Sequence, residues 1–236
     1  MVDQFGNRLH FQDEMQKLED EALGGLELVA KTIDRTREAV REQDVELAGM
    51  VIADDDLIDG LYLQVHQGVL SLMALQAPVA TDLRLVAAVL DVIKHIERMG
   101  DGCVNVAKLI PLAGNEPPRE LDILAAIDRM AAQAKAQVLQ AGEAFRSRDA
   151  ALAEDLVRQD DEIDRLNRDV FRLALAVGDD AGAREWAMTM MLMARSFERI
   201  GDHAVDIGEQ VAFVVTGLFR EFTDASHPDV VPRPAV

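Results

Sequence analysis

The chain has 236 residues, of which 24 are basic and 43 acidic, giving a formal net charge of −19 at pH 7. This charge argues against direct binding to nucleic acid or to an anionic membrane surface, because each would repel the chain. Hydrophobic residues make up 49% of the sequence and aromatic residues 4%, which excludes a disordered acidic chain and favours a core of packed aliphatic helices.

The sequence also predicts where the chain resides. Cys103 is the only cysteine, and the first residues lack the basic and apolar regions of a secretory signal. No stretch approaches the length of about 18 apolar residues that a membrane-spanning helix needs. We therefore expect a cytoplasmic protein that inserts into no membrane and reaches one only through protein partners.

Proline positions and hydrophobic periodicity predict six long helices. All seven prolines fall in four places, so the long intervals between them contain no helix breaker of this kind. Within these intervals apolar residues recur every three or four positions, as in Leu18, Ala22, Leu26 and Val29, which is typical of one helix face. In chain order, we expect helices over residues 11–42, 44–76, 79–110, 119–147, 149–177 and 183–222.

A segment rich in proline, residues 111–118, interrupts this pattern in the middle of the chain. Three predicted helices lie on each side of it, and three long amphipathic helices with short connections pack as an antiparallel bundle. We therefore predict an all-α fold of two tandem three-helix bundles. Their bounds are residues 1–112 and 119–224, with a linker over residues 113–118 and a flexible tail over residues 225–236.

The two halves of the chain are similar in sequence. Residues 96–106 match residues 197–207 at an offset of 101, and residues 55–59 match residues 160–164 at an offset of 105. The difference of four residues falls in a predicted connection between helices, where it is easily absorbed. The two predicted bundles therefore derive from duplication of one three-helix unit.

Acidic residues recur in pairs at these duplicated positions. Four residues separate the members of each pair, which places both carboxylates on one helix face, beside the apolar stripe. The pairs are Asp55 with Asp59, Glu97 with Asp101, Asp160 with Asp164, and Glu198 with Asp202, and Asp206 extends the last of them.

Partly buried carboxylates must be protonated, paired with cations or bound to metal. If the second and third helices of each bundle face one another, their acidic pairs gather into clusters of oxygen ligands, which suit divalent or trivalent ions such as Mg, Mn or Fe. We therefore predict a multi-carboxylate metal site on each bundle. The first site should be weaker, because Gly102 and Asn105 stand where the second half has His203 and Asp206.

Salt bridges are the alternative explanation for these acidic residues. A basic residue stands three positions before each Glu or Asp in the two duplicated motifs, namely Lys94, Arg98, Arg195 and Arg199. Exposed ion pairs of this kind are common on helices. The residues alone leave both interpretations open, a metal site or an ion-paired surface.

Motifs for other chemistry are scarce. None of the five histidines follows a Glu by three residues, as di-iron helices require, and the sequence has no glycine-rich phosphate loop. Cys103 lacks a second cysteine and an evident base, which predicts a buried structural thiol. His203 projects away from the acidic face, which predicts a surface histidine.

Four motifs occur with the order and spacing of a known family. They are Glu-Arg-Met-Gly-Asp at 97–101, Glu-Arg-Ile-Gly-Asp-His-Ala at 198–204, Pro-Val-Ala-Thr-Asp-Leu-Arg at 78–84, and the two Asp-x-x-Ile-Asp segments. The chain resembles the PhoU family of phosphate-uptake regulators over roughly residues 10–222.

The resemblance implies two similar three-helix bundles and a regulatory, non-enzymatic function. Family members are cytoplasmic adaptors linked to the phosphate ABC transporter and to a membrane sensor histidine kinase, and they repress phosphate-starvation genes when phosphate is plentiful. Some bind iron or other metals through Glu/Asp-x-x-x-Asp motifs, which implicates the four acidic pairs named above, with Fe, Mn, Mg or Zn as the candidate ions.

The sequence leads to further expectations about phosphate sensing and oligomeric state, and it leaves two alternative functions open. The net charge and the absence of an evident basic pocket oppose direct capture of phosphate, so we expect phosphate status to arrive through a partner. Long bundles with methionine-rich faces favour a homo-oligomer, and we expect a dimer. A metal-dependent phosphohydrolase and a metal-free structural bundle are the alternative functions.

Overall fold

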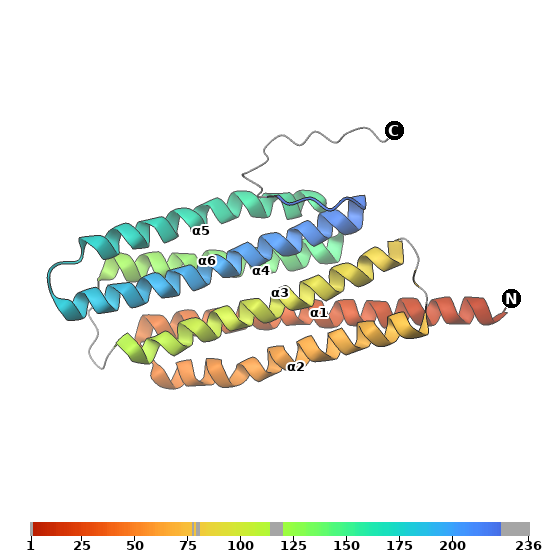
Figure 1. Cartoon of the computed structure of the whole chain (residues 1–236), viewed down its shortest axis with the longest axis horizontal. Coiled ribbons are helices and arrows are strands. Elements are labelled where there is room, and N and C mark those ends of the chain that lie inside the picture. Colours follow the sequence, from red (N-terminus) through yellow and green to blue (C-terminus); the bar gives the residue numbers. More distant parts are fainter. Residues whose placement is uncertain (1, 77, 79–80, 114–119, 223–236) are drawn as a thin grey trace.

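The structure, a computed structural model, describes residues 2–76, 78, 81–113 and 120–222, with only the backbone described for residues 2–7 and 9. These residues form six long α-helices and one short 3-10 helix, and no strand occurs among them (Figure 1). The elements are α1 (Val2–Glu42), α2 (Val45–Leu75), α3 (Thr81–Leu109), η1 (Ile110–Ala113), α4 (Leu121–Ser147), α5 (Ala150–Ala176) and α6 (Ala181–Thr216). The predicted all-α fold with six long helices is confirmed.

Helices α1–α3 form one bundle and α4–α6 form the other, and the two bundles lie side by side (Figure 1). α1 packs against α4, and α3 packs against α6, so each bundle contributes two helices to the interface. One hydrophobic cluster runs through both bundles and includes the fully buried Ile33, Ile96, Phe145 and Phe197. The two predicted bundles therefore share one continuous core.

The helix ends agree with the predicted ones to within two residues, except at the ends of the chain. α1 begins at Val2 rather than near residue 11, because the segment before residue 11 contains no proline to stop the helix. α6 ends at Thr216 rather than near residue 222, because Gly217 adopts a left-handed conformation with φ of 73°. The predicted tail and most of the predicted linker lie outside the described residues.

The turns between the first two helices of each bundle are built alike. Gln43 has φ of 55° and Arg148 has φ of 57°, and each is followed by an aspartate that caps the next helix. Asp44 accepts a hydrogen bond from the Leu47 backbone N–H, and Asp149 accepts two from the start of α5. These turns fix how α2 and α5 enter their bundles.

Ion pairs reinforce the contact between α1 and α4. Arg37 donates two hydrogen bonds to Asp128, with N–O distances of 2.5 and 2.6 Å, and Lys135 lies 2.6 Å from Asp34. Partly exposed pairs such as these contribute at most about 1 kcal/mol each. The shared apolar core therefore supplies most of the free energy that joins the bundles.

Within the described ranges, none of the helices combines the length and the apolar character needed to cross a membrane.

Candidate functional site

The first predicted set of carboxylates gathers where α2 packs against α3. We call Asp55, Asp59, Glu97 and Asp101 the first carboxylate cluster. Burial, together with the negative charges of Asp59, Asp101 and Glu97, raises the pKa of Asp55 to about 6. Burial and the charges of Asp101 and Asp59 also raise the pKa of Glu97. The four carboxylates are thus close enough to repel one another, as the facing-helix hypothesis requires.

The second set gathers in the same way where α5 packs against α6. Asp160, Asp164, Glu198 and Asp202 form the second carboxylate cluster. Burial, together with the charges of Asp202 and Asp164, raises the pKa of Asp160 to about 6, although a hydrogen bond from Gln137 opposes the shift. Burial, together with Asp164, raises the pKa of Asp202, although Arg195 opposes the shift. Both bundles therefore concentrate like charge at equivalent places.

A glycine on the facing helix makes room for one aspartate in each cluster. A Cβ atom placed on Gly100 would lie 2.8 Å from the Asp55 Oδ1 atom, and one on Gly201 would lie 2.8 Å from the Asp160 Oδ1 atom. Any larger residue at these positions would push the carboxylate away. The glycine of each Glu-Arg-x-Gly-Asp motif is therefore explained by close approach of the neighbouring helix.

Glu198 gives an independent indication that the second cluster fits a cation. Its side chain is only 7% exposed, and one carboxylate oxygen pairs with Arg195 on the same helix. The other oxygen, Oε2, is buried and has no hydrogen-bond partner within the described part of the chain. A buried, unpaired carboxylate oxygen is costly in free energy unless a proton or a cation compensates it. The carboxylates of this cluster have the donor chemistry of a hard-cation site. Among the described residues, however, no three of these carboxylates bring oxygen atoms within 4.8 Å of one another, so binding one ion requires the side chains to turn toward a common point.

Salt bridges neutralise only part of these clusters. Arg195 pairs with Glu198, and Arg98 lies 3.3 Å from Glu97 and 3.8 Å from Asp101. Among the described residues, Lys94 and Arg199 form no ion pair with the acidic residue three positions ahead. Asp55 and Asp160 also have no basic side chain within 4 Å among the residues that the structure covers. Arg168 also lies 3.2 Å from Asp164. Ion pairing thus reaches Glu97, Asp101, Asp164 and the deeply buried Glu198, and it leaves Asp55 and Asp160 without a basic partner in the described structure.

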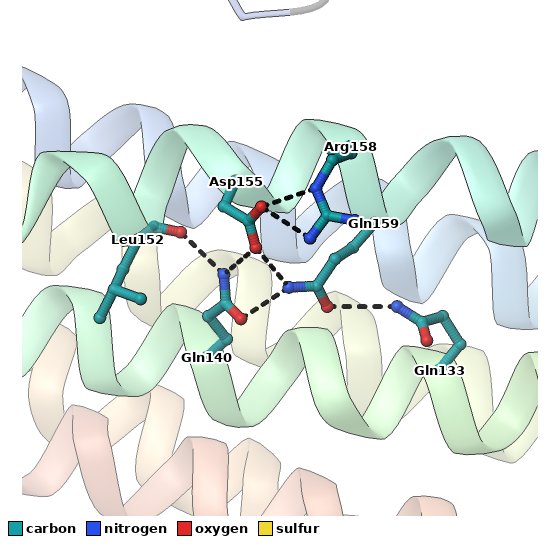
Figure 2. A network of polar contacts seen from close by, with 6 residues as sticks. All are labelled: Gln133, Gln140, Leu152, Asp155, Arg158 and Gln159. Atoms are coloured by element: carbon teal, nitrogen blue, oxygen red, sulfur yellow. Dashed lines mark hydrogen bonds and ion pairs between the residues drawn. The ribbon is translucent and has the colours of Figure 1, made fainter.

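Glutamines line the contact between α4 and α5 beside the second cluster (Figure 2). Gln140 and Gln159 both donate to Asp155, at 3.1 and 3.0 Å, and Gln159 donates to Gln140 at 2.6 Å. Together with Arg158, these donors lower the pKa of Asp155 to about 2. Gln137, on the same face of α4, donates to Asp160 at 3.3 Å. The glutamine network therefore holds Asp155, and Gln137 alone of these glutamines donates to a member of the second cluster in the described structure.

Asp206, which the sequence grouped with the second cluster, contacts two histidines, and its charge also acts on Asp202. Its Oδ2 atom is 3.3 Å from the His95 Nδ1 atom on α3 and 3.2 Å from the His203 Nδ1 atom. The His203 side chain is 18% exposed, so the prediction of a surface histidine is wrong. The reason is that α3, from the other bundle, covers this face of α6, which the sequence of α6 alone does not reveal.

A pocket of about 100 Å³ opens between α3 and α6, lined by Arg98, Asp101, Gly102, Asn105, Ser196, Arg199 and His203. The two arginines give it some positive charge, which sequence analysis did not find. Because Arg98 already pairs with Glu97 and Asp101, the pocket carries charges of both signs. It therefore differs from a basic pocket devoted to an anion.

The lone thiol is structural, as predicted. Cys103 has no exposed surface, and burial raises its pKa to about 12. A thiol held in its neutral form is a poor nucleophile.

Comparison with known proteins identifies the family. The model of the PhoU domain matches the chain twice, over residues 26–110 and 127–211. The chain belongs to the PhoU family. The two matches coincide with the two bundles, so each bundle is one PhoU domain.

Individual PhoU relatives align over most of the chain. The phosphate-specific transport system accessory protein PhoU homolog of Zymomonas mobilis is 33% identical over 197 residues, which cover 83% of this chain and 81% of that protein. The homolog of the same name from Aquifex aeolicus is 32% identical over 187 residues, covering 79% of this chain and 84% of that protein.

Solved structures support the same fold. The crystal structure of PhoU from Pseudomonas aeruginosa superimposes with a TM-score of 0.83 at 27% identity, covering 88% of this chain and 100% of that one. The phosphate transport system regulatory protein PhoU from Streptococcus pneumoniae superimposes with a TM-score of 0.82 at 23% identity, covering 89% and 99%. The predicted resemblance to the PhoU family is therefore confirmed.

Proposed function

We propose that this chain is a cytoplasmic accessory regulator of phosphate transport. It couples the phosphate ABC transporter to a membrane sensor histidine kinase and represses phosphate-starvation genes when phosphate is plentiful. The observation that carries this proposal is membership of the PhoU family over both bundles, with relatives named as accessory proteins of the phosphate-specific transport system. The protein works as an adaptor and not as an enzyme, and it associates with the membrane only through its partners.

Exposed apolar side chains on α2 support a function in partner binding. Leu57, Leu63 and Leu70 are each more than half exposed, and α2 packs only against elements of its own bundle within the described structure. Apolar groups that stay in water along one helix are typical of a protein interaction surface. This surface serves either a transporter subunit or the second copy in a homodimer.

The two carboxylate clusters hold metal ions in this proposal. Asp55, Asp59, Glu97 and Asp101 bind one ion, and Asp160, Asp164, Glu198 and Asp202 bind the other, with Fe, Mn, Mg and Zn as candidates. The raised pKa values of Asp55 and Asp160 and the unpaired oxygen of Glu198 support it. A bound cation supplies positive charge that allows neighbouring carboxylates to stay ionised, so the ion stabilises the contact between the second and third helices of each bundle.

Regulation is tested in cells that lack the gene for this chain. We expect a phosphate-starvation reporter to be expressed in phosphate-rich medium in the deletion strain and to be repressed again when the wild-type chain is supplied. Failure of the wild-type chain to restore repression contradicts the proposal. A pull-down from phosphate-replete and phosphate-starved cells then identifies whether transporter and kinase subunits bind.

Metal binding is tested separately with purified protein. Equilibrium dialysis followed by metal analysis compares wild type with the double variant Glu198→Gln/Asp202→Asn. The matched control is Glu154→Gln/Glu185→Gln, which changes the charge equally at two exposed positions on α5 and α6. We expect the cluster variant alone to lose metal. Equal metal content in all three proteins contradicts the metal sites and leaves the regulatory function untouched.

A further inference from the structure

A second kind of ligand cluster lies at the contact between the two bundles, outside both carboxylate clusters. His95 comes from α3, and His203 and Asp206 come from α6. We call these three residues the interbundle triad. The two histidine side chains are 15% and 18% exposed, so the triad is largely shielded from water, while the Asp206 side chain is 41% exposed.

Three ligand atoms of the triad converge on one point. The His95 and His203 Nδ1 atoms are 3.3 Å apart, and the Asp206 Oδ2 atom is 3.3 and 3.2 Å from them. Metal–ligand bonds of about 2.0–2.1 Å in a tetrahedron require ligand atoms separated by about 3.3 Å. The triangle therefore has the size of one face of a tetrahedral zinc site.

Hydrogen bonding alone satisfies this arrangement poorly. A neutral imidazole has one N–H donor and one bare nitrogen, so two Nδ1 atoms and one carboxylate oxygen cannot all be paired by a single shared proton. If both Nδ1 atoms carried protons toward Asp206, one carboxylate oxygen would accept two hydrogen bonds from nitrogen atoms only 3.3 Å apart. A cation at the centre accepts all three lone pairs at once.

Charges of both signs surround the triad. Asp91 and Asp206 act on His95 against Lys94, and Glu97 and Asp202 lie within electrostatic reach of His203. Arg98 and Arg199 line the pocket that His203 also borders. The case for a cation therefore depends on the geometry of the three ligand atoms.

Sequence duplication does not account for the triad. At the offset of 101, the counterparts of His95, His203 and Asp206 are Ser196, Gly102 and Asn105. These counterparts line the pocket between α3 and α6 that His203 also borders, and Gly102 packs closely there against Ile200. The same contact therefore holds together without histidines, so packing of α3 on α6 does not require them.

We propose that His95, His203 and Asp206 bind one transition-metal ion of the zinc class, through two imidazole nitrogens and one carboxylate oxygen. Mixed nitrogen and oxygen donors distinguish this site from the all-oxygen carboxylate clusters, which favour harder ions. Three protein ligands leave a fourth position for water or an exchangeable anion. Because its ligands come from both bundles, the ion cross-links α3 to α6.

Cobalt(II) serves as the probe, because a four-coordinate site with nitrogen ligands absorbs strongly in the visible range and a six-coordinate all-oxygen site absorbs weakly. We expect metal-stripped wild-type protein to show a strong band that saturates at one equivalent of Co²⁺ and disappears when Zn²⁺ is added. His95→Gln and His203→Gln should each weaken binding about 100-fold or more. His66→Gln, a half-buried histidine on α2, and Asp164→Asn, in the second carboxylate cluster, should both keep the band.

Two results would overturn the proposal: no strong band with wild type, or the same band in His95→Gln and His203→Gln. A second measurement avoids dependence on folding of the variants. Addition of Zn²⁺ to ¹⁵N-labelled wild type should shift the ring-nitrogen resonances of His95 and His203 together and leave those of His66 in place. Unshifted His95 and His203 resonances would show that the triad is a hydrogen-bonded cluster without metal. Zn²⁺ at 100 times its dissociation constant for the triad should also raise the Tm by about 5 °C more in wild type than in His95→Gln, which retains only the carboxylate clusters.

Discussion

The two carboxylate clusters share a backbone arrangement but differ in their surroundings. A Cβ atom placed on Gly100 would lie as close to the Asp55 Oδ1 atom as one placed on Gly201 would lie to the Asp160 Oδ1 atom. The duplication therefore preserved how closely the two helices approach. In the second cluster, however, Glu198 is almost fully buried, whereas its counterpart Glu97 is 24% exposed. The two halves therefore keep the same helix approach but differ in how deeply the glutamate is buried. The deeper burial of Glu198 makes the second cluster the stronger candidate for a metal.

The two clusters also differ in the hydrogen-bond donor that the first helix of each bundle offers. Gln137 of α4 donates to Asp160, while Thr32, its counterpart on α1 at an offset of 105, donates to the Leu28 carbonyl of its own helix. Asp55 therefore lacks the hydrogen bond that Asp160 receives from the neighbouring helix in the described structure.

The largest expected effect is on metal affinity. We expect Asp160→Asn/Asp202→Asn to weaken metal binding at the second cluster by about 100-fold or more, and Asp55→Asn/Asp101→Asn to weaken the first by about tenfold. The reason is that the ligands of the second cluster are more buried in the metal-free protein. Isothermal titration with Mn²⁺ measures both. Equal losses in the two variants would remove the distinction between the clusters.

The next effect concerns the two glycines. A Cβ atom on Gly201 would meet Asp160, Gln137 and Ile163 within 3.0 Å, whereas one on Gly100 would meet only Asp55 and Ile58 at that range. We expect Gly201→Ala to lower the free energy of unfolding by about 2 kcal/mol. Gly100→Ala should cost under half as much, because Asp55 can turn toward solvent and alanine favours the helix.

Urea denaturation of the metal-free proteins measures these free energies, with Gly49→Ala as the control. Gly49 lies in α2, and a Cβ there would meet no atom within 4 Å. Greater destabilisation by Gly100→Ala than by Gly201→Ala would contradict the proposed difference in packing.

A smaller effect is the pH dependence of the metal-free protein. The pKa values of Asp55 and Asp160 are about 6 in the folded chain, above the unfolded value near 3.8, so the folded state binds more protons between pH 4 and 6. The contribution of these groups to stability is therefore present below about pH 4 and is lost as pH rises through 6. After allowance for partial exposure, we expect about 1 kcal/mol for each group.

Melting curves at pH 5 and pH 7.5, recorded with a chelator, test this prediction. Asp55→Asn should be more stable than wild type at pH 7.5 without metal, since it removes the repelled charge. Saturating Mn²⁺ should reverse the order. A metal-free Asp55→Asn protein less stable than wild type at pH 7.5 would contradict the repulsion inferred for the first cluster.

The smallest expected effect comes from the glutamine donor. Gln137→Leu removes the hydrogen bond to Asp160 and also removes a buried Oε1 atom that has no partner among the described residues. These changes oppose each other, so we expect the free energy of unfolding to change by less than about 1 kcal/mol. The pKa of Asp160 should nevertheless rise, as measured by carboxyl ¹³C titration of the metal-free protein. The matched variant Thr32→Val should leave the pKa of Asp55 unchanged.

Several features of the candidate site were predictable from the sequence. The i, i+4 spacing placed both members of each acidic pair on one helix face, and the duplication indicated that two such clusters would exist. The role of Gly100 and Gly201 was not predicted, although their place in the repeated motif was visible. Their function depends on how closely α2 and α5 approach, which the local sequence does not encode.

The interbundle triad was the clearest omission. His95 and His203 are 108 residues apart, and helical periodicity on α6 alone assigned His203 to the surface. Comparison of the repeats shows where they differ, because His95 of the first repeat corresponds to Ser196, and His203 and Asp206 of the second correspond to Gly102 and Asn105. It does not show that these three residues meet.

By itself, the sequence determined the six helices, their duplication and the family, because proline positions and apolar spacing act along a single segment. Only the tertiary structure decided that the two bundles share a core through α1 with α4 and α3 with α6. It also decided which polar side chains meet there. Such contacts depend on the rotation of one helix against another, and that rotation is set by side-chain packing across the whole interface rather than by any local pattern.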